Sequence, residues 1–230
     1  MRRGLTLLLW ALPTLGLAAE GGEVFTFFQA DKLEYRAGDD NAWAWEAQGW
    51  VGGDFNKLWL KSKGEKVEGG DFEKSEVQLL YSRLISDFFD VQMGFRHDFE
   101  PEPERSYLVL GLEGLAPYYF EVNASAFLSD EGEFSARLEG EYELLFTSKL
   151  ILQPTLELEW WGSDVAEREI QSGFTDLELG LRLRYEIVRE VAPYVGLHWE
   201  RKLGDTASLA RDEGEGIDNL YVVAGLRLWF

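Results

Sequence analysis

Few side chains in this sequence can bind a metal through nitrogen or sulfur. The 230 residues contain no cysteine, two histidines (His97 and His198) and two methionines (Met1 and Met93). Copper(II) takes imidazole and oxygen ligands, whereas copper(I) prefers thioether sulfur. His198 and Glu200 are two residues apart, so on a β-strand they share one face. The sequence therefore predicts a weak metal site made by His198 and Glu200 with help from His97. The alternative is a hydrogen-bonded wall residue at His198.

β-Strands must position these residues. The stretch Asn219–Phe230 has one fully apolar face, and its other face is mixed and carries Arg227. Glu133–Leu145 and Phe174–Ile187 set carboxylates and arginines on one face against unbroken hydrocarbon on the other. A barrel wall with lipid outside and water inside needs this period of two. A terminal aromatic residue is typical of the closing strand of a bacterial outer-membrane barrel.

Repeated alternation predicts one all-β domain, an antiparallel transmembrane β-barrel of about 12 strands, over residues 20–230. We expect the first and last strands to pair, because a closed barrel leaves no free edge. The longer, acidic connections Asp98–Glu104, Ser163–Gly173 and Gly204–Asp218 should then lie outside the cell, with both termini in the periplasm. A soluble β-sandwich is the runner-up fold. The predicted strands are Phe25–Arg36, Ala42–Gly52, Lys57–Glu65, Lys74–Ile85, Asp90–Asp98, Arg105–Leu115, Tyr119–Leu128, Glu133–Leu145, Leu150–Gly162, Phe174–Ile187, Pro193–Leu203 and Asn219–Phe230.

Alternation also predicts which side chains face the lumen. Met93 falls with Val91 and Phe95 on the lipid face, and His97 follows the same parity at the outer rim, next to Asp98. Facing acids and arginines should pair, either as a polar core that fills the barrel or as a pathway or site for a cation. The inward set is Glu46, Gln48, Trp59, Lys61, Glu113, Glu121, Asn123, Arg137, Glu139, Glu141, Glu157, Glu159, Glu178, Arg182, Arg184, His198, Glu200 and Arg227.

Charge and targeting signals agree with a location in the outer membrane of a Gram-negative cell. A net charge of −20 argues against nucleic-acid binding. Residues 1–19 combine Arg2 and Arg3, a short apolar run and small residues at Ala18 and Ala19. They are predicted to be a cleaved signal peptide.

Several runs resemble the bacterial copper resistance protein B family over essentially the whole chain after residue 19. They are Phe28–Glu65, Leu79–Phe99, Gly111–Gly132, Glu141–Pro154, Asp176–Arg211 and the closing VAGLRLWF. The resemblance implies an outer-membrane barrel involved in copper resistance or copper homeostasis, often beside a periplasmic multicopper oxidase. Many family members carry a Met- and His-rich segment before the barrel, and the sequence before Phe25 contains none.

Three hypotheses for function follow. The first is a barrel, embedded in outer-membrane lipid, that binds copper ions weakly or assists their passage. The second is a small general pore or a structural barrel without a metal role. The third is an outer-membrane lipase, which needs a Ser or Thr nucleophile beside a histidine on the lipid face. The sequence offers no evident outward serine partner for either histidine, so we expect the protein not to be an enzyme.

Overall fold

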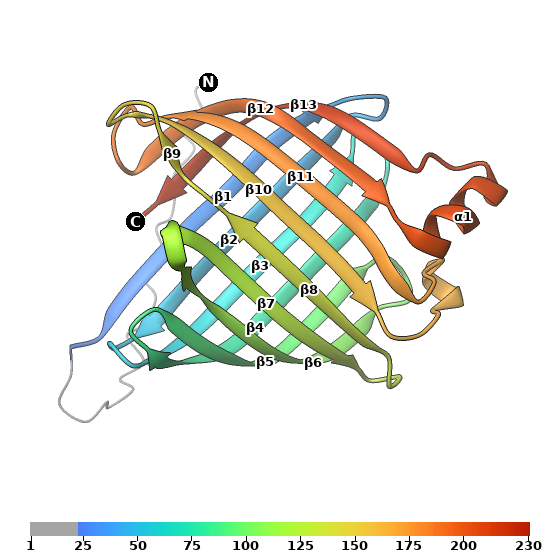
Figure 1. Ribbon diagram of the computed structural model, residues 1–230, viewed down its shortest axis with the longest axis horizontal. Coiled ribbons are helices and arrows are strands. Elements are labelled where there is room, and N and C mark those ends of the chain that lie inside the picture. Colours follow the sequence, from blue (N-terminus) through green and yellow to red (C-terminus); the bar gives the residue numbers. More distant parts are fainter. Residues whose placement is uncertain (1–22) are drawn as a thin grey trace, which may run out of the picture.

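The computed structural model describes residues 23–230, which form a closed antiparallel β-barrel (Figure 1). Each strand pairs with its neighbours in the chain, and β8 and β9 together occupy one position in the wall, so the wall has twelve strand positions. The strands are β1 (Phe25–Ala37), β2 (Ala42–Gly52), β3 (Asn56–Val67), β4 (Phe72–Ser86), β5 (Phe89–Glu100), β6 (Arg105–Ala116), β7 (Phe120–Ser129), β8 (Phe134–Glu141), β9 (Leu144–Leu145), β10 (Leu150–Trp161), β11 (Gly173–Tyr185), β12 (Val191–Lys202) and β13 (Asp218–Trp229).

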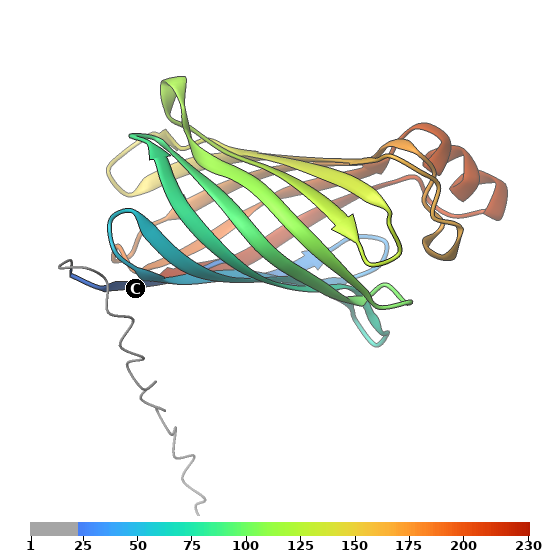
Figure 2. The ribbon, with the colours of Figure 1, turned by 90° about the horizontal axis from the view of Figure 1, so that it is seen from below.

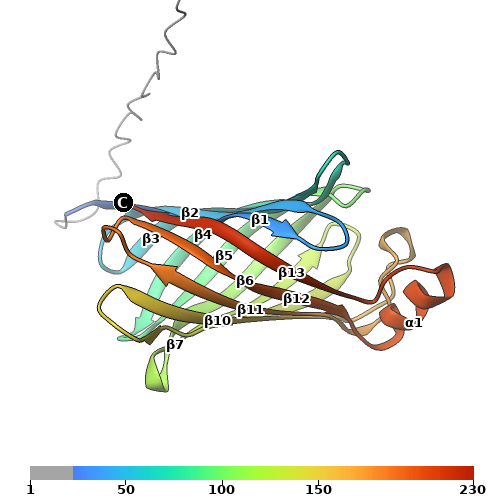
Figure 3. The ribbon, with the colours of Figure 1, turned by 90° about the horizontal axis from the view of Figure 1, so that it is seen from above.

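The predicted seam is confirmed. β13 pairs antiparallel with β1, with Gln29 opposite Trp229 and Ala37 opposite Val222 (Figure 3). Phe28 and Phe230 exchange both backbone hydrogen bonds, at 3.0 and 2.8 Å. The terminal residue therefore closes the hydrogen-bonded ladder and leaves no free sheet edge there.

The two ends of the barrel differ. The end that carries Phe25 and Phe230, here the terminus end, has short connections, including the 3₁₀ turn η1 (Pro117–Tyr119) between β6 and β7. The opposite end, here the loop end, carries the connection 162–172 with the 3₁₀ turn η2 (Ala166–Arg168). It also carries the helix α1 (Gly204–Glu213) (Figure 2). The predicted long connections all lie at this end, although the helix within one of them was not expected.

The outer surface is apolar, with an aromatic belt at each end. Leucine, valine and phenylalanine side chains project outward from the middle of the strands, as the alternation predicts. Such a surface suits lipid, and belts of aromatic residues at both ends are typical of barrels that span a membrane. Exposed belt residues are Trp43, Phe72, Phe99, Phe134 and Phe174 at the loop end, and Phe55, Phe88, Tyr118, Tyr119, Phe146 and Tyr185 at the terminus end.

Two irregularities depart from simple alternation. A bulge in β1 between Ala30 and Lys32 turns both Asp31 and Lys32 toward the lumen, where they contact Arg227 and Glu46. The predicted strand Glu133–Leu145 is divided into β8 and β9. There the chain runs past the end of β7 and faces Pro154, which has no N–H to donate to the ladder.

Among residues 23–230, no helix has the length and apolar character needed to cross a membrane. The predicted signal peptide, residues 1–19, lies outside the described residues.

Candidate functional site

The lumen holds a polar cavity of about 380 Å³. Its walls carry nine carboxylates but only four lysine or arginine side chains, together with His198. The lining runs from Gln29, Gln48 and Glu121 near the terminus end to His198 and Glu178 deeper in the barrel. An excess of fixed negative charge inside a low-dielectric wall raises the local concentration of cations.

Loop 162–172 covers the loop end of the barrel. The Arg168 guanidinium donates to Asp98 Oδ2 (3.1 Å), Tyr107 Oη (3.0 Å) and the Pro103 carbonyl oxygen (2.7 Å). Val165 is buried in an apolar cluster with Trp161, Tyr107 and residues of β3, β4 and β7 inside the barrel. These contacts join the loop to the inner wall, and no residue of this loop lines the cavity.

The loop is also held by a hydrogen bond within it and by one to the helix α1. The Ser172 backbone N–H donates to Asp164 Oδ1 (2.8 Å), and this hydrogen bond holds the pKa of the Asp164 carboxyl below its usual value. The Gln171 backbone N–H donates to Thr206 Oγ1 of α1 (3.0 Å), which ties the loop to the helix. The helix itself ends at Glu213 and is capped by Gly214, where φ is +84° and a glycine is favoured.

Two buried ion-pair networks brace the wall around the cavity. Arg182 of β11 donates twice to Glu34 of β1, at 2.8 and 3.0 Å, and Arg36 and Tyr194 also donate to Glu34. In the second network, Arg137 of β8 donates twice to Glu76 of β4, both at 3.0 Å. Arg96 also reaches Glu76 and connects it to Asp98, the partner of Arg168. The predicted pairing of acids with arginines across the lumen is confirmed.

His198 and Glu200 project into the lumen from β12, as predicted. His198 is only 2% exposed, and neither ring nitrogen has a hydrogen-bond partner among the described residues. Its Nε2 lies 3.8 Å from Glu200 Oε2 and 3.6 Å from Glu178 Oε2 of β11. One carboxylate from each of β11 and β12 thus approaches the buried imidazole, whose nitrogens would otherwise carry a desolvation cost, although the three ligand atoms do not all lie within 4.8 Å of one another.

Glu178 is the neighbour of His198 that sequence spacing missed. The alternation of the sequence puts Glu178 on the inward face, but it does not say that Glu178 lies beside His198. The strand register brings it there, because Glu178 pairs with Glu200 across β11 and β12. Alternation assigns a side chain to a face, but only the register says which side chains on that face touch.

The structure does not bring His97 to this pair. His97 projects from the outer face of β5 and stacks edge-on against Phe99, with ring centroids 4.6 Å apart. Its Nδ1 lies 2.9 Å from Ser106 Oγ, directly opposite on β6, and its Nε2 lies 3.6 Å from Glu104 Oε2. Met93 is also on the outer face, as expected.

The contact between His97 and Ser106 corrects the expectation that neither histidine has an outward serine partner. That expectation was wrong because Ser106 is the second residue of β6, and the register across the loop 101–104 could not be read from spacing. The backbone N–H of Ser106 points at Asp130 Oδ1, 3.4 Å away. A carboxylate at that position would repel an oxyanion formed next to this N–H.

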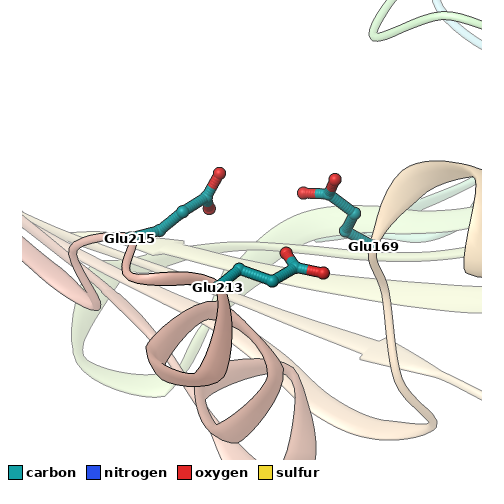
Figure 4. A group of neighbouring side chains, drawn as sticks. All are labelled: Glu169, Glu213 and Glu215. Atoms are coloured by element: carbon teal, nitrogen blue, oxygen red, sulfur yellow. The ribbon is translucent and has the colours of Figure 1, made fainter.

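A third group of carboxylates lies outside the barrel, at the loop end. Glu169, Glu213 and Glu215 place one oxygen each within 4.8 Å of one another, from loop 162–172 and the end of α1 (Figure 4). All three side chains are exposed, and Lys202 already pairs with Glu215 at 2.9 Å. This arrangement is an acidic patch in water.

Comparison with known proteins places the chain in a family. Residues 24–230 match the model of the family described as "Copper resistance protein B precursor (CopB)". The chain is 46% identical over 206 residues to a copper resistance protein B homolog of Pseudomonas syringae pv. tomato, covering 89% of this chain and 70% of that protein. It is 42% identical over 201 residues to copper resistance protein B of Escherichia coli, covering 87% and 68%.

Solved structures similar to the chain share its fold at low sequence identity. The NanC porin aligns with a TM-score of 0.56 at 13% identity, covering 89% of this chain and 99% of that one. The outer membrane phospholipase A from Escherichia coli aligns at 0.50 and 14%, covering 88% and 92%. These likenesses concern the barrel alone. The family match and the two relatives carry the assignment: this chain belongs to the copper resistance protein B family.

Proposed function

We propose that this protein is an outer-membrane barrel that supports copper resistance by binding copper ions in its lumen. Three observations support the proposal: membership of the copper resistance protein B family, the apolar outer surface with two aromatic belts, and the acidic cavity. Copper is the cargo in this proposal.

The orientation follows from the connections. Bacterial outer-membrane barrels keep short turns in the periplasm and long loops outside. The terminus end would then face the periplasm, and its cavity would exchange ions with that compartment. Export through a signal peptide at residues 1–19, and a periplasmic multicopper oxidase that works beside the barrel, remain predictions.

His198 carries the proposal. A buried imidazole without a hydrogen bond is costly, and it lies beside two carboxylates at the inner end of the cavity. Imidazole with carboxylate oxygens is a ligand set that suits copper(II). His198, Glu200 and Glu178 would hold the ion through one nitrogen and two oxygens.

Replacement of His198 by alanine should lower copper(II) affinity by at least on the order of 100-fold, since loss of an outer-shell partner alone costs 10- to 100-fold. The measurement is titration of the refolded barrel, with electron paramagnetic resonance to detect nitrogen coordination. His97→Ala is the matched control, because His97 lies on the outer face, and it should leave that lumen site unchanged. An unchanged affinity in His198→Ala would remove the lumen site.

Deletion of the gene should lower tolerance to copper more than tolerance to zinc or detergent. Equal sensitivity to all three would favour the alternative of a structural barrel, for which the dense ion-pair networks are the supporting observation. Complementation with the His198→Ala variant tests whether the lumen site is what confers tolerance. We propose no catalytic role. The backbone N–H of Ser106 donates to the Asp130 carboxylate, so this N–H is not free to stabilise an oxyanion.

A further inference from the structure

One row of carboxylates crosses the inner wall from end to end. Its members lie directly opposite one another on successive strands, so that each is the register partner of the next or is separated from it by one asparagine. We call this set the carboxylate row: Asp90, Glu113, Glu139, Glu157, Glu178 and Glu200. Asn123 stands between Glu113 and Glu139, and Asn219 follows Glu200.

Strand tilt turns this row into a path along the barrel. Register partners lie side by side perpendicular to the strands, and the strands are inclined to the barrel axis (Figure 1). The row therefore climbs as it goes round. It begins at Asp90, the second residue of β5 at the terminus end, and reaches Asn219, the second residue of β13 at the loop end.

Such a row is unfavourable unless cations accompany it. Glu139, Glu157, Glu178 and Glu200 are four like charges on adjacent strands, and like charges directly opposite in a sheet destabilise it. Lysines supplied by β3 and β4 compensate. Lys61 pairs with Glu113, Lys63 pairs with Glu157, and Lys74 Nζ lies 2.8 Å from Glu178 Oε1.

Two steps of the row have no lysine or arginine partner. Among residues 23–230, no ion pair involves Glu139, although it lines the cavity between Asn123 and Glu157. Glu200 accepts hydrogen bonds from Asn219 and Tyr221 and faces His198, the buried imidazole without a hydrogen bond. The row thus joins a free carboxylate in the cavity to the proposed copper site.

We infer that the carboxylate row is a line of binding sites for divalent metal cations, whose resident lysine ammonium groups are displaced as the metal ions bind. Cations that enter from the terminus end would bind first at Glu139, the carboxylate in the cavity without an ion pair. They would then bind at Glu157 and Glu178 as Lys63 and Lys74 are displaced from these carboxylates. The inference rests on the proposed function for one point, that the lumen accepts metal ions.

The test uses manganese(II), which prefers carboxylate oxygen over imidazole, and follows the free ion by electron paramagnetic resonance. All proteins carry Glu213→Gln, which weakens metal binding at the exposed acidic patch of Glu169, Glu213 and Glu215. Folding is verified on a gel, where a folded barrel changes its mobility after heating. Glu139→Gln should lower manganese affinity by about tenfold or more, since a unit charge about 4 Å from a cation is worth at least that at an effective dielectric near 20. Glu131→Gln, in the exposed turn 130–133, is the matched control and should change nothing.

Lys63→Gln should raise manganese affinity, because it removes the ammonium group that pairs with Glu157 and leaves only the longer, 3.4 Å contact of Glu157 with Arg137. This opposite sign separates metal binding from damage to the wall, which would lower affinity in both variants. No response to Glu139→Gln, or no gain in Lys63→Gln, overturns the row. His198→Ala should lower copper(II) affinity at the site beside Glu200 but leave manganese affinity nearly unchanged. Failure of copper binding with an intact manganese response would therefore sink the proposed function and spare the row.

Discussion

Replacing Glu34 by alanine should destabilise the barrel by about 3–5 kcal/mol, the cost of removing one partner from a buried ion pair. Glu34 is 0% exposed and joins β1 to Arg182 of β11 and Tyr194 of β12. Its loss leaves the Arg182 guanidinium buried without a carboxylate partner, whereas Arg36 keeps its 2.7 Å ion pair with Glu65. The effect would fall near the seam, since β13 is the only strand between β12 and β1. Urea unfolding of the refolded barrel, followed by tryptophan fluorescence, measures it.

A second variant shows whether the loss of stability in Glu34→Ala comes from an unpaired buried charge or only from a shorter side chain. The double variant Glu34→Leu with Arg182→Leu removes both charges and should be more stable than the alanine variant, because no buried charge is left unpaired. Lys202→Ala breaks the exposed pair with Glu215 and should change stability little. A Glu34→Ala barrel as stable as that control would contradict the role assigned to the network.

Alternation was sufficient to predict the wall of the barrel. A period of two assigns each side chain to lipid or lumen, and Arg227 does reach acids inside, with Nε 3.3 Å from Asp31 Oδ1 and Nη1 3.1 Å from Glu143 Oε1. The seam followed from closure alone, because an unpaired edge cannot remain in a membrane. These features depend on local pattern and on one topological rule.

Features that depend on register or on loops could not be predicted in this way. The bulge in β1 places Asp31 and Lys32 on the same side, which strict alternation forbids. Glu178 beside His198, and Ser106 beside His97, each required the pairing of two strands to be known residue by residue. Of the candidate site, the sequence supplied His198 and Glu200 on one face, and the register supplied the third group.

Loop 162–172 is the other feature that lay beyond the sequence pattern. Its residues show no alternation, and an acidic extracellular loop is ordinarily expected to stay in water. Instead, Val165 packs into the apolar cluster inside the barrel, and the Arg168 side chain is 3% exposed beside Asp98. Burial of an arginine that donates to Asp98, Tyr107 and the Pro103 carbonyl fixes the loop over the mouth of the lumen.

Shortening this loop should convert a closed barrel into a conducting one. In planar bilayers, we expect the wild-type protein to stay near background current, because the loop and its apolar cluster fill the loop end while the cavity occupies the inner part of the barrel. Replacing residues 163–171 by two glycines should give discrete current steps, and Arg168→Ala should give shorter, flickering openings, since Val165 and Ile170 still pack inside. Arg211→Ala, on the exposed part of α1, is the control and should remain closed. Steady conductance of the wild-type protein, or a closed loop-deleted barrel, would show that loop 162–172 is not what closes the lumen.

In the conducting variant, the excess of lumen carboxylates should make the current cation-selective, so a reversal potential favouring anions would contradict the charge distribution described for the cavity.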